Sequence, residues 1–213
     1  MKKVMIILIA ILVVSCSTTI PLQVNLNDQT MLMAPNKNIK VEAKIKSEVP
    51  DGFIKYTSVQ KNGVERPYNQ SYMYNASTAH SKIWKSYMSS KFNSYSDDVI
   101  EITIILKELM LRDKVSTSIG LSMMTGNIQN ATECIIVIEA IINYKGENFH
   151  KSIEVSTSDF NESQTSSYGG ISYVRNQKNP TQQKAQLIDN CFNKSIVHFE
   201  NYLTSVLQTM DKY

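Results

Sequence analysis

Three histidines, His80, His150 and His198, are the side chains in this chain best suited to acid–base or metal chemistry. Such chemistry needs a base beside a nucleophile or a second acid, or several metal ligands at short spacing. The histidines belong to separate expected elements, and the sequence contains no His-x-x-x-His, Cys-x-x-Cys or Asp-x-Asp pattern. It also lacks a Gly-x-Ser-x-Gly elbow. The sequence therefore predicts no enzyme, no metal site and no cofactor, with a hydrolase built from dispersed residues as the alternative.

Cys16 stands at the end of a short apolar run, and its neighbours define its chemistry. Two lysines precede eleven apolar residues at positions 4–14, and Ser15 separates this run from the cysteine. A positive segment, a short apolar run and a small residue form the pattern of an export signal. Since a transmembrane helix needs about 20 residues, we expect residues 1–15 to be a signal peptide that is removed.

The sequence "VVSC" that ends at Cys16 resembles the lipobox of bacterial lipoproteins, which consists of an aliphatic residue, a spacer, a small residue and a cysteine. The resemblance implies cleavage before Cys16 and a diacylglyceryl thioether on its sulfur. Each buried methylene contributes about 0.8 kcal/mol to membrane binding, and two acyl chains make the anchoring stable. Ser17 and Thr18 follow without an aspartate, which in this class favours the outer membrane, with the chain facing the periplasm. The alternative is an ordinary signal peptide followed by an unmodified cysteine.

The net charge argues against nucleic acid as a partner. Removal of residues 1–15 takes two lysines from the 22 basic residues, which leaves 20 against 19 acidic residues and lowers the formal charge from +3 to +1. Arg66, Arg112 and Arg175 are the only arginines and lie far apart in the sequence, so no basic stripe is available to follow a phosphate backbone. The roughly 200 residues that remain suit one domain with a real core.

Cys134 and Cys191 are the two cysteines that remain after Cys16, and both lie on apolar faces of expected elements. An oxidising periplasm permits such a pair to form a disulfide. The sequence does not fix their separation in space, so two buried free thiols are the alternative.

The sequence "DFNES" at residues 159–163 contains Asn161 in an Asn-x-Ser acceptor for N-glycosylation. It resembles the extended acceptor of bacterial N-glycosylation systems, which adds an acidic residue two positions before the asparagine. Residues 159–180 have no hydrophobic periodicity and include a Gly-Gly pair. They therefore predict an irregular surface loop, which suits an acceptor.

Residues 16–38 hold two prolines and several asparagines, which is typical of a tether between the lipidated cysteine and the domain. A flexible run of this length reaches roughly 25 Å. The alternative is that part of the run docks as an edge strand, because Ile20, Leu22, Val24 and Leu26 alternate with other residues.

Hydrophobic patterning predicts a single α+β domain at residues 39–213. Its first segment alternates apolar residues with charged ones, mainly lysines, and the sequence "PDG" at residues 50–52 predicts the turn of a hairpin over residues 39–60. The lysine face protects an exposed strand from aggregation or, alternatively, binds anionic lipid headgroups. Residues 63–77 are interpreted as a Tyr-rich loop.

Two helices and a strand meander complete the expected domain. Apolar residues at three- and four-residue spacing predict helices over about 77–94 and 182–210, and three apolar segments between them predict an antiparallel meander. We therefore expect a mostly antiparallel sheet of about five strands with the two helices packed on it. His80 and His198 lie near the apolar helix faces and are interpreted as structural, and His150 is placed on the wet face of its strand.

The order of elements from residue 77 to residue 210, together with the lipobox at Cys16, resembles the small envelope lipoproteins of the YajG and LptE type. The resemblance implies that a lipid-anchored domain supports or plugs a larger envelope assembly. It gives no binding residues, because only the lipobox has a matching position. We therefore predict a non-catalytic accessory subunit with an envelope protein as partner. A carrier or sensor, with a pocket for a hydrophobic ligand between the sheet and the last helix, is the alternative.

Overall fold

The computed structural model describes residues 17–31, 38–59, 64–67, 71–92, 95–115, 129–162, 164–168, 171–175 and 180–210. Their helices are α2 (Asp28–Met31), α3 (Ala76–Lys91) and α5 (Pro180–Met210). Their strands are β1 (Ser17–Thr19), β2 (Lys40–Ser47), β3 (Gly52–Val59), β4 (Glu65–Pro67), β5 (Ser71–Tyr74), β6 (Val99–Val115), β7 (Gln129–Tyr144), β8 (Glu147–Glu162), β9 (Gln164–Tyr168) and β10 (Ile171–Arg175). The predicted α+β fold is confirmed, but its details differ from the expected five strands and two helices.

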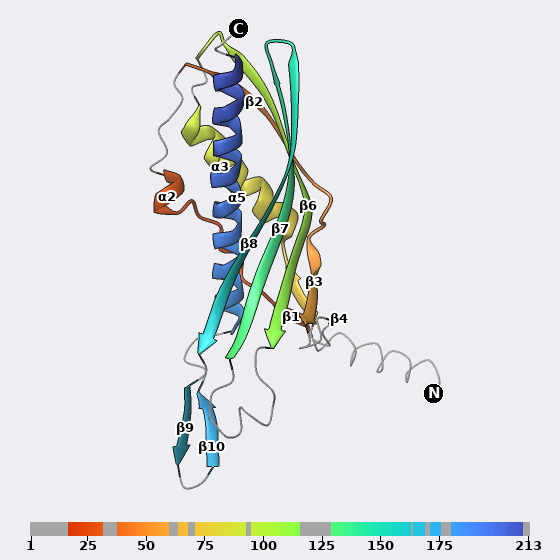
Figure 1. Ribbon diagram of the computed structural model, residues 1–213, viewed down its shortest axis with the longest axis vertical. Helices are drawn as coiled ribbons and strands as arrows, with labels where there is room; N and C mark the ends of the chain where they lie inside the picture. Colours follow the sequence, from red (N-terminus) through yellow and green to blue (C-terminus); the bar gives the residue numbers. More distant parts are fainter. Residues whose placement is uncertain are drawn as a thin grey trace, which may run out of the picture.

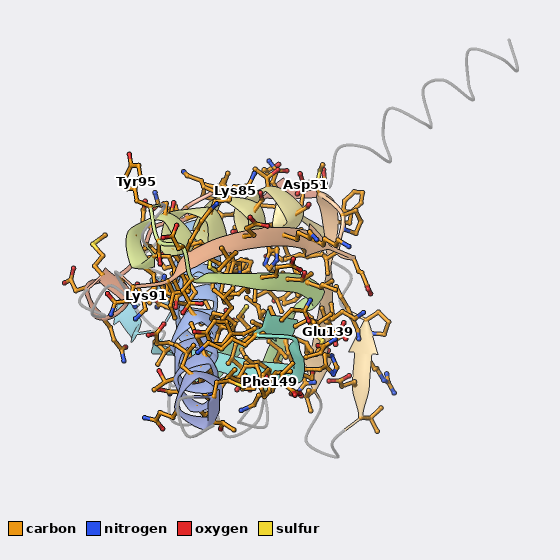
Figure 2. The ribbon with its side chains drawn as sticks, turned by 90° about the horizontal axis from the view of Figure 1, so that it is seen from above. Asp51, Lys85, Lys91, Tyr95, Glu139 and Phe149 are labelled. Atoms are coloured by element: carbon orange, nitrogen blue, oxygen red, sulfur yellow. The ribbon has the colours of Figure 1, made fainter. Side chains whose placement is uncertain are left out.

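Eight of the strands form one mixed sheet, and β9 and β10 form a separate two-stranded sheet. The long helix α5 follows β7 and β8, and α3 lies over β2 and β6 (Figure 1). Both helices lie on the same side of the sheet, and Figure 2 shows this arrangement from above. In the part of the chain that is described, the other face of the sheet carries no helix.

The three longest strands, β6, β7 and β8, form the antiparallel meander that the sequence predicts. Ile102 of β6 pairs with Ile142 of β7, and both side chains are buried against the helices because opposite residues share a face of the sheet. The register shifts after Leu106. This bulge turns Leu109 toward the helices, so the apolar face of β6 continues as far as Leu111.

The predicted hairpin over residues 39–60 is wrong. β2 and β3 lie end to end along one edge of β6, and each pairs with it in parallel. The 17 residues of β6 offer enough edge for both strands. Pro50 lacks the N–H donor of a sheet ladder, and Gly52 takes a φ of 134°, which bends the chain between the strands without reversing it.

Residues 63–77, interpreted as a loop, contain two short strands that pair with β3. Tyr72 and Tyr74 of β5 are 6% and 1% exposed, and the ring of Tyr72 packs edge-on against Tyr56 with 5.1 Å between centroids. These two tyrosines therefore belong to the core. The two strands pair antiparallel with β3. The sheet is mixed because β2 and β3 pair in parallel with β6, and β1 pairs in parallel with β5.

The helices predicted at about 77–94 and 182–210 are confirmed as α3 and α5. Asp51 caps the start of α3 from the β2–β3 connection, because its Oδ1 accepts the Thr78 backbone N–H at 3.1 Å and its Oδ2 accepts the Thr78 hydroxyl at 2.6 Å. Partial burial acts to raise the pKa of Asp51, but the hydrogen bonds from Thr78 outweigh it and lower that pKa.

Aromatic packing and hydrogen bonds hold α3 against α5. Trp84 and Phe199 pack edge to face with 5.3 Å between ring centroids. Glu200 accepts hydrogen bonds from the Tyr87 hydroxyl and from the Lys91 ammonium. Burial and the adjacent Glu200 carboxylate raise the pKa of Tyr87. Because enclosed charges lose their hydration, this group depends on its internal partners and fixes how the two helices sit together.

The segment of residues 17–31 is docked on the domain. β1 pairs in parallel with β5 at the edge of the sheet, and Ile20 and Val24 are buried. The side chain of Asn193 on α5 binds the backbone further along the segment. The tether interpretation is therefore wrong for these residues, and the edge strand is β1 rather than residues 20–26.

Residues 159–180, predicted as an irregular loop, contain several strands. β8 extends to Glu162, which lies opposite Gln129 of β7, and β9 and β10 pair antiparallel. A strand partner supplies backbone hydrogen bonds whatever the side-chain pattern. The loss of apolar alternation in this segment was therefore not a sign that the strand had ended.

Candidate functional site

A groove with a volume of about 380 Å³ lies between β2 and α3. Its lining residues come from one face of β2 and from the C-terminal half of α3 with the residue after it: Val41, Ala43, Ile45, Lys85, Met88, Ser89 and Phe92. The lining is mainly apolar, with an ammonium and a hydroxyl among its groups. Hollows of this composition are the usual form of a binding surface.

The periodicities of the two elements place these side chains together. Alternate residues of a strand share one face, so the odd-numbered residues of β2 face α3. Val41 and Ile45 are half-buried, whereas Ala43 between them is exposed. The sequence predicted this face of the strand as buried, but α3 covers it only in part. The small side chain of Ala43 leaves the middle of the groove open.

The backbone of β2 has an open edge beside the groove. Among the described strands β2 pairs only with β6. The Lys40 N–H donates to the Asp98 carbonyl at 2.7 Å, and the Glu48 N–H donates to the Leu106 carbonyl at 2.8 Å. The even-numbered residues therefore bond to β6, and the odd-numbered residues turn their N–H and C=O groups to the open edge. These are the residues whose side chains line the groove.

The surroundings of the groove are positively charged. Lys44 and Lys46 project from β2 on the face opposite α3, and Lys85 is exposed on α3 above β2 (Figure 2). Lys40 lies 3.9 Å from Glu42. Within the ranges that the structure describes, the other three lysines form no ion pair. Glu42 and Glu48 share the face of Lys44 and Lys46, but their carboxylates pair with Lys40 and Lys107. The excess positive charge at Lys44, Lys46 and Lys85 favours an acidic partner.

The helix-free face of the sheet carries an ion network around Lys107. Its Nζ lies 2.5 Å from Glu48 Oε1 and 3.3 Å from Glu139 Oε2, and Glu139 Oε1 lies 2.5 Å from His150 Nε2. Hydrogen bonds to Glu48 and Glu139 raise the pKa of Lys107, and those from His150 and Lys107 lower the pKa of Glu139. The predicted solvent-exposed position of His150 is confirmed. Its partner Glu139 lies on the helix-free face of the sheet, where Figure 2 labels it.

The other two histidines differ in their surroundings. His80 is 1% exposed, and its ring lies 6.2 Å from the rings of Trp84 and Phe192, measured between centroids. Within the described residues neither ring nitrogen makes a hydrogen bond of good geometry, although backbone groups of Ile104 and Lys46 lie close enough to favour the protonated ring. Burial lowers the pKa of His80 to about 4. His198 is exposed on α5, so its assignment to an apolar helix face is wrong.

The described residues give no arrangement for metal chemistry. Within them, no group of three or more His, Cys, Asp or Glu side chains is placed to hold a metal ion. No helix of the described ranges is both long enough and apolar enough to cross a membrane.

Cys134 of β7 and Cys191 of α5 are buried free thiols at the interface of helix and sheet. The Cys191 Sγ lies 3.4 Å from the Cys134 carbonyl oxygen and 3.6 Å from the Val155 carbonyl oxygen. Burial raises the pKa of Cys134. The fold therefore brings the two cysteines together as thiols, and the disulfide between them stays a prediction.

Two predicted modification sites are Cys16 and Asn161. Cys16 lies outside the described residues, which begin at Ser17 in β1. The backbone of Asn161 is in β8, opposite Asn130 of β7, and not in the irregular loop that was expected for the acceptor. Lipidation and glycosylation at these positions stay predictions.

A half-buried polar cluster surrounds Asp113, and no sequence pattern predicted it. Its carboxylate accepts hydrogen bonds from the Tyr56 hydroxyl and, at 2.7 Å, from the Thr132 hydroxyl. The Nζ of Lys184 lies 5.6 Å and 5.0 Å from the ring centroids of Tyr56 and Tyr72, and burial lowers the pKa of Lys184. These residues come from distant parts of the chain, so no local pattern predicts them. Because they already engage one another, we interpret the cluster as structural.

Comparisons with known proteins add a likeness of fold. No protein-family model matches the sequence, and no curated protein matches it significantly. A crystal structure of an uncharacterized protein superposes with a TM-score of 0.44 at 9% identity, over 88% of this chain and 97% of that chain. Protein XCC0632 from Xanthomonas campestris, of the family DUF330, superposes with a TM-score of 0.44 at 10% identity, over 92% of this chain and 99% of that chain. Likenesses of this degree carry no argument about this chain.

Proposed function

We propose that this chain is a lipid-anchored, non-catalytic accessory subunit of a bacterial envelope assembly and acts through protein contacts. The groove between β2 and α3, with the open backbone edge of β2 beside it, is the observation that carries the proposal. Proteins usually cover or pair the edges of their sheets. An open edge next to an apolar hollow suits the binding of another chain.

The packing between the sheet and α5 supports protein contacts over the carriage of a hydrophobic ligand. A carrier of the expected kind needs a lined cavity in this layer. Phe192, Ile196 and Phe199 of α5 are all 0% exposed and belong to the same core cluster as Ile136 and Ile138 of β7. Side chains packed at the density of a protein interior leave little room for a ligand.

The membrane anchor rests on the lipobox that ends at Cys16. Replacement of this residue in the tagged full-length chain, Cys16→Ala, is expected to move the protein from the membrane fraction to the soluble fraction, because the acyl chains are lost. Thr19→Ala is the matched control and is expected to leave the protein on membranes. Retention of the Cys16→Ala protein in the membrane fraction contradicts the anchor.

The accessory role is tested by cross-linking in cells. A photoreactive amino acid is placed at Ala43 in the groove or at Asn190, an exposed residue of α5, in the tagged full-length chain. We expect one dominant envelope protein to cross-link at Ala43 and not at Asn190, identified by mass spectrometry after solubilisation in detergent. Equal labelling at the two positions, or no protein at Ala43, contradicts contact through the groove.

A further inference from the structure

We infer that the open edge of β2 binds an extended segment of the partner as an added strand, and that apolar and acidic residues alternate along this segment. The inference rests on the proposed function and names the chemistry of the partner. Three features of the structure define it: the backbone direction of β2, the groove on one face of the strand, and the lysines on the other.

The backbone sets the mode of binding. The odd-numbered residues of β2 turn their N–H and C=O groups away from β6, as the bonds from Lys40 to Asp98 and from Glu48 to Leu106 show. A row of such groups at every second residue matches the hydrogen bonds of one further strand. The partner must therefore be extended where it binds, since a helix has no free backbone groups to offer.

The groove selects apolar side chains on one face of the added strand. Side chains that point toward α3 enter the hollow beside the exposed Ala43, between the half-buried Val41 and Ile45 and the α3 residues Met88 and Phe92. They cover apolar surface that α3 leaves open. Because strand side chains alternate between faces, this requirement falls on every second residue of the partner.

The lysines select acidic side chains on the other face. The remaining residues of the added strand point to the helix-free face of the sheet, beside Lys44 and Lys46, which have no ion pair within the described residues. Opposite charges on neighbouring strands attract, and like charges repel. Acidic residues at these positions compensate the two ammonium groups.

A second copy of this chain is the other occupant to be tested. In an antiparallel pair of β2 strands symmetric about Lys44, this residue lies opposite itself, whereas Glu42 lies opposite Lys46 and Lys40 lies opposite Glu48. Self-pairing is therefore an outcome of the test below, where it is detected as a dimer that the peptide dissociates.

The test uses short fluorescent peptides and the full-length chain in detergent. A peptide of alternating valine and glutamate is expected to bind saturably in fluorescence anisotropy, and one of alternating valine and lysine at least about tenfold more weakly. Two further peptides carry N-methyl groups on one or the other set of alternate residues. Strand addition predicts that only one of these two loses binding, because only one set donates hydrogen bonds to β2. Equal behaviour of the two N-methylated peptides overturns the inference.

Charge reversal in the protein gives the matched comparison. The double variant Lys44→Glu/Lys46→Glu is expected to lose about tenfold in affinity for the valine–glutamate peptide and to gain affinity for the valine–lysine peptide. Lys82→Glu reverses one charge on α3 outside the groove lining and is expected to bind as the parent does. Thermal unfolding checks that each variant is folded. Unchanged preference in the double variant overturns the inference, as does a dimer that the peptide dissociates.

The failure of this inference is distinguishable from failure of the proposed function. If an envelope protein cross-links at Ala43 in cells while the peptides fail these tests, protein contact through the groove stands and strand addition is wrong. If Ala43 also captures no envelope protein, both are wrong.

Discussion

The side-chain oxygen of Asn193 on α5 accepts a hydrogen bond from the backbone N–H of Asn27 at 2.9 Å, and so joins the last helix to the start of the described chain. The same oxygen accepts the Thr30 hydroxyl at 2.9 Å, and Nδ2 donates to the carbonyls of Asn25 and Asp189, each at 2.9 Å. Asn193 is 1% exposed. All four bonds satisfy polar groups that lie partly or wholly away from water.

Asn193→Ala is expected to lower the free energy of unfolding by about 2 kcal/mol, because it leaves part-buried backbone groups without their partner. Residues 25–30 are expected to exchange their amide hydrogens faster. Urea unfolding and hydrogen exchange measure the two effects, and Asn190→Ala, at an exposed position of the same helix, is the control. Equal stability of the two variants contradicts the role assigned to Asn193.

His80 is expected to make stability depend on pH. Its pKa falls from 6.5 to about 4 on folding, so the unfolded chain binds the proton more tightly. The stability that this residue contributes is complete above its unfolded pKa and is lost as the pH falls toward 4, by roughly 3 kcal/mol in all. His80→Leu is expected to flatten this dependence in urea unfolding measured from pH 4 to pH 7. A parallel pH profile in the variant rules out a neutral buried imidazole.

The Lys91–Glu200 pair is expected to show strong coupling. Its side chains are 10% and 16% exposed, so Glu200→Leu leaves an enclosed ammonium and is expected to lower the free energy of unfolding by about 3 kcal/mol. The double variant Lys91→Met/Glu200→Leu is expected to lose less than the sum of the single losses. A double-mutant cycle in urea measures this difference, and additive losses show that the pair is not coupled.

Cys134 and Cys191 are expected to resist alkylation in the folded, reduced chain, because both are 0% exposed. Maleimide labelling across a urea series is expected to follow global unfolding. The predicted disulfide is tested on protein from the oxidising compartment, by peptide mapping without reductant, with Cys191→Ser as control. Two free thiols in that protein contradict the disulfide.

Patterns within one element predicted this fold better than patterns that depend on a partner strand. The apolar faces of α3, α5 and the β6–β8 meander are readable because each repeats at the period of its own element. The "PDG" sequence at residues 50–52 indicated a bend, but whether the chain reverses there depends on the length of β6, which accepts both flanking strands. The end of β8 is a strand because β7 continues beside it.

The candidate site was less predictable than the fold. The alternation of Val41, Ala43 and Ile45 identified a strand with one apolar face, which the structure contains. It gave no means of knowing that α3 covers this face incompletely, since that depends on how α3 packs against α5 through Trp84 and Phe199. The groove thus arises from the position of α3, and no pattern within the sequence of α3 predicts how this helix lies relative to β2.

The position of β1 has a consequence for how the proposed lipoprotein meets its partner. The described chain is part of the sheet from Ser17 onward, so an acyl group on Cys16, as proposed, is separated from the folded domain by very few bonds. Such an anchor holds the domain close to the bilayer while it diffuses laterally. The domain and its partner then meet by diffusion in two dimensions, and the groove stays within a thin layer parallel to the membrane. Association is therefore fast only for a partner whose binding segment lies within that layer.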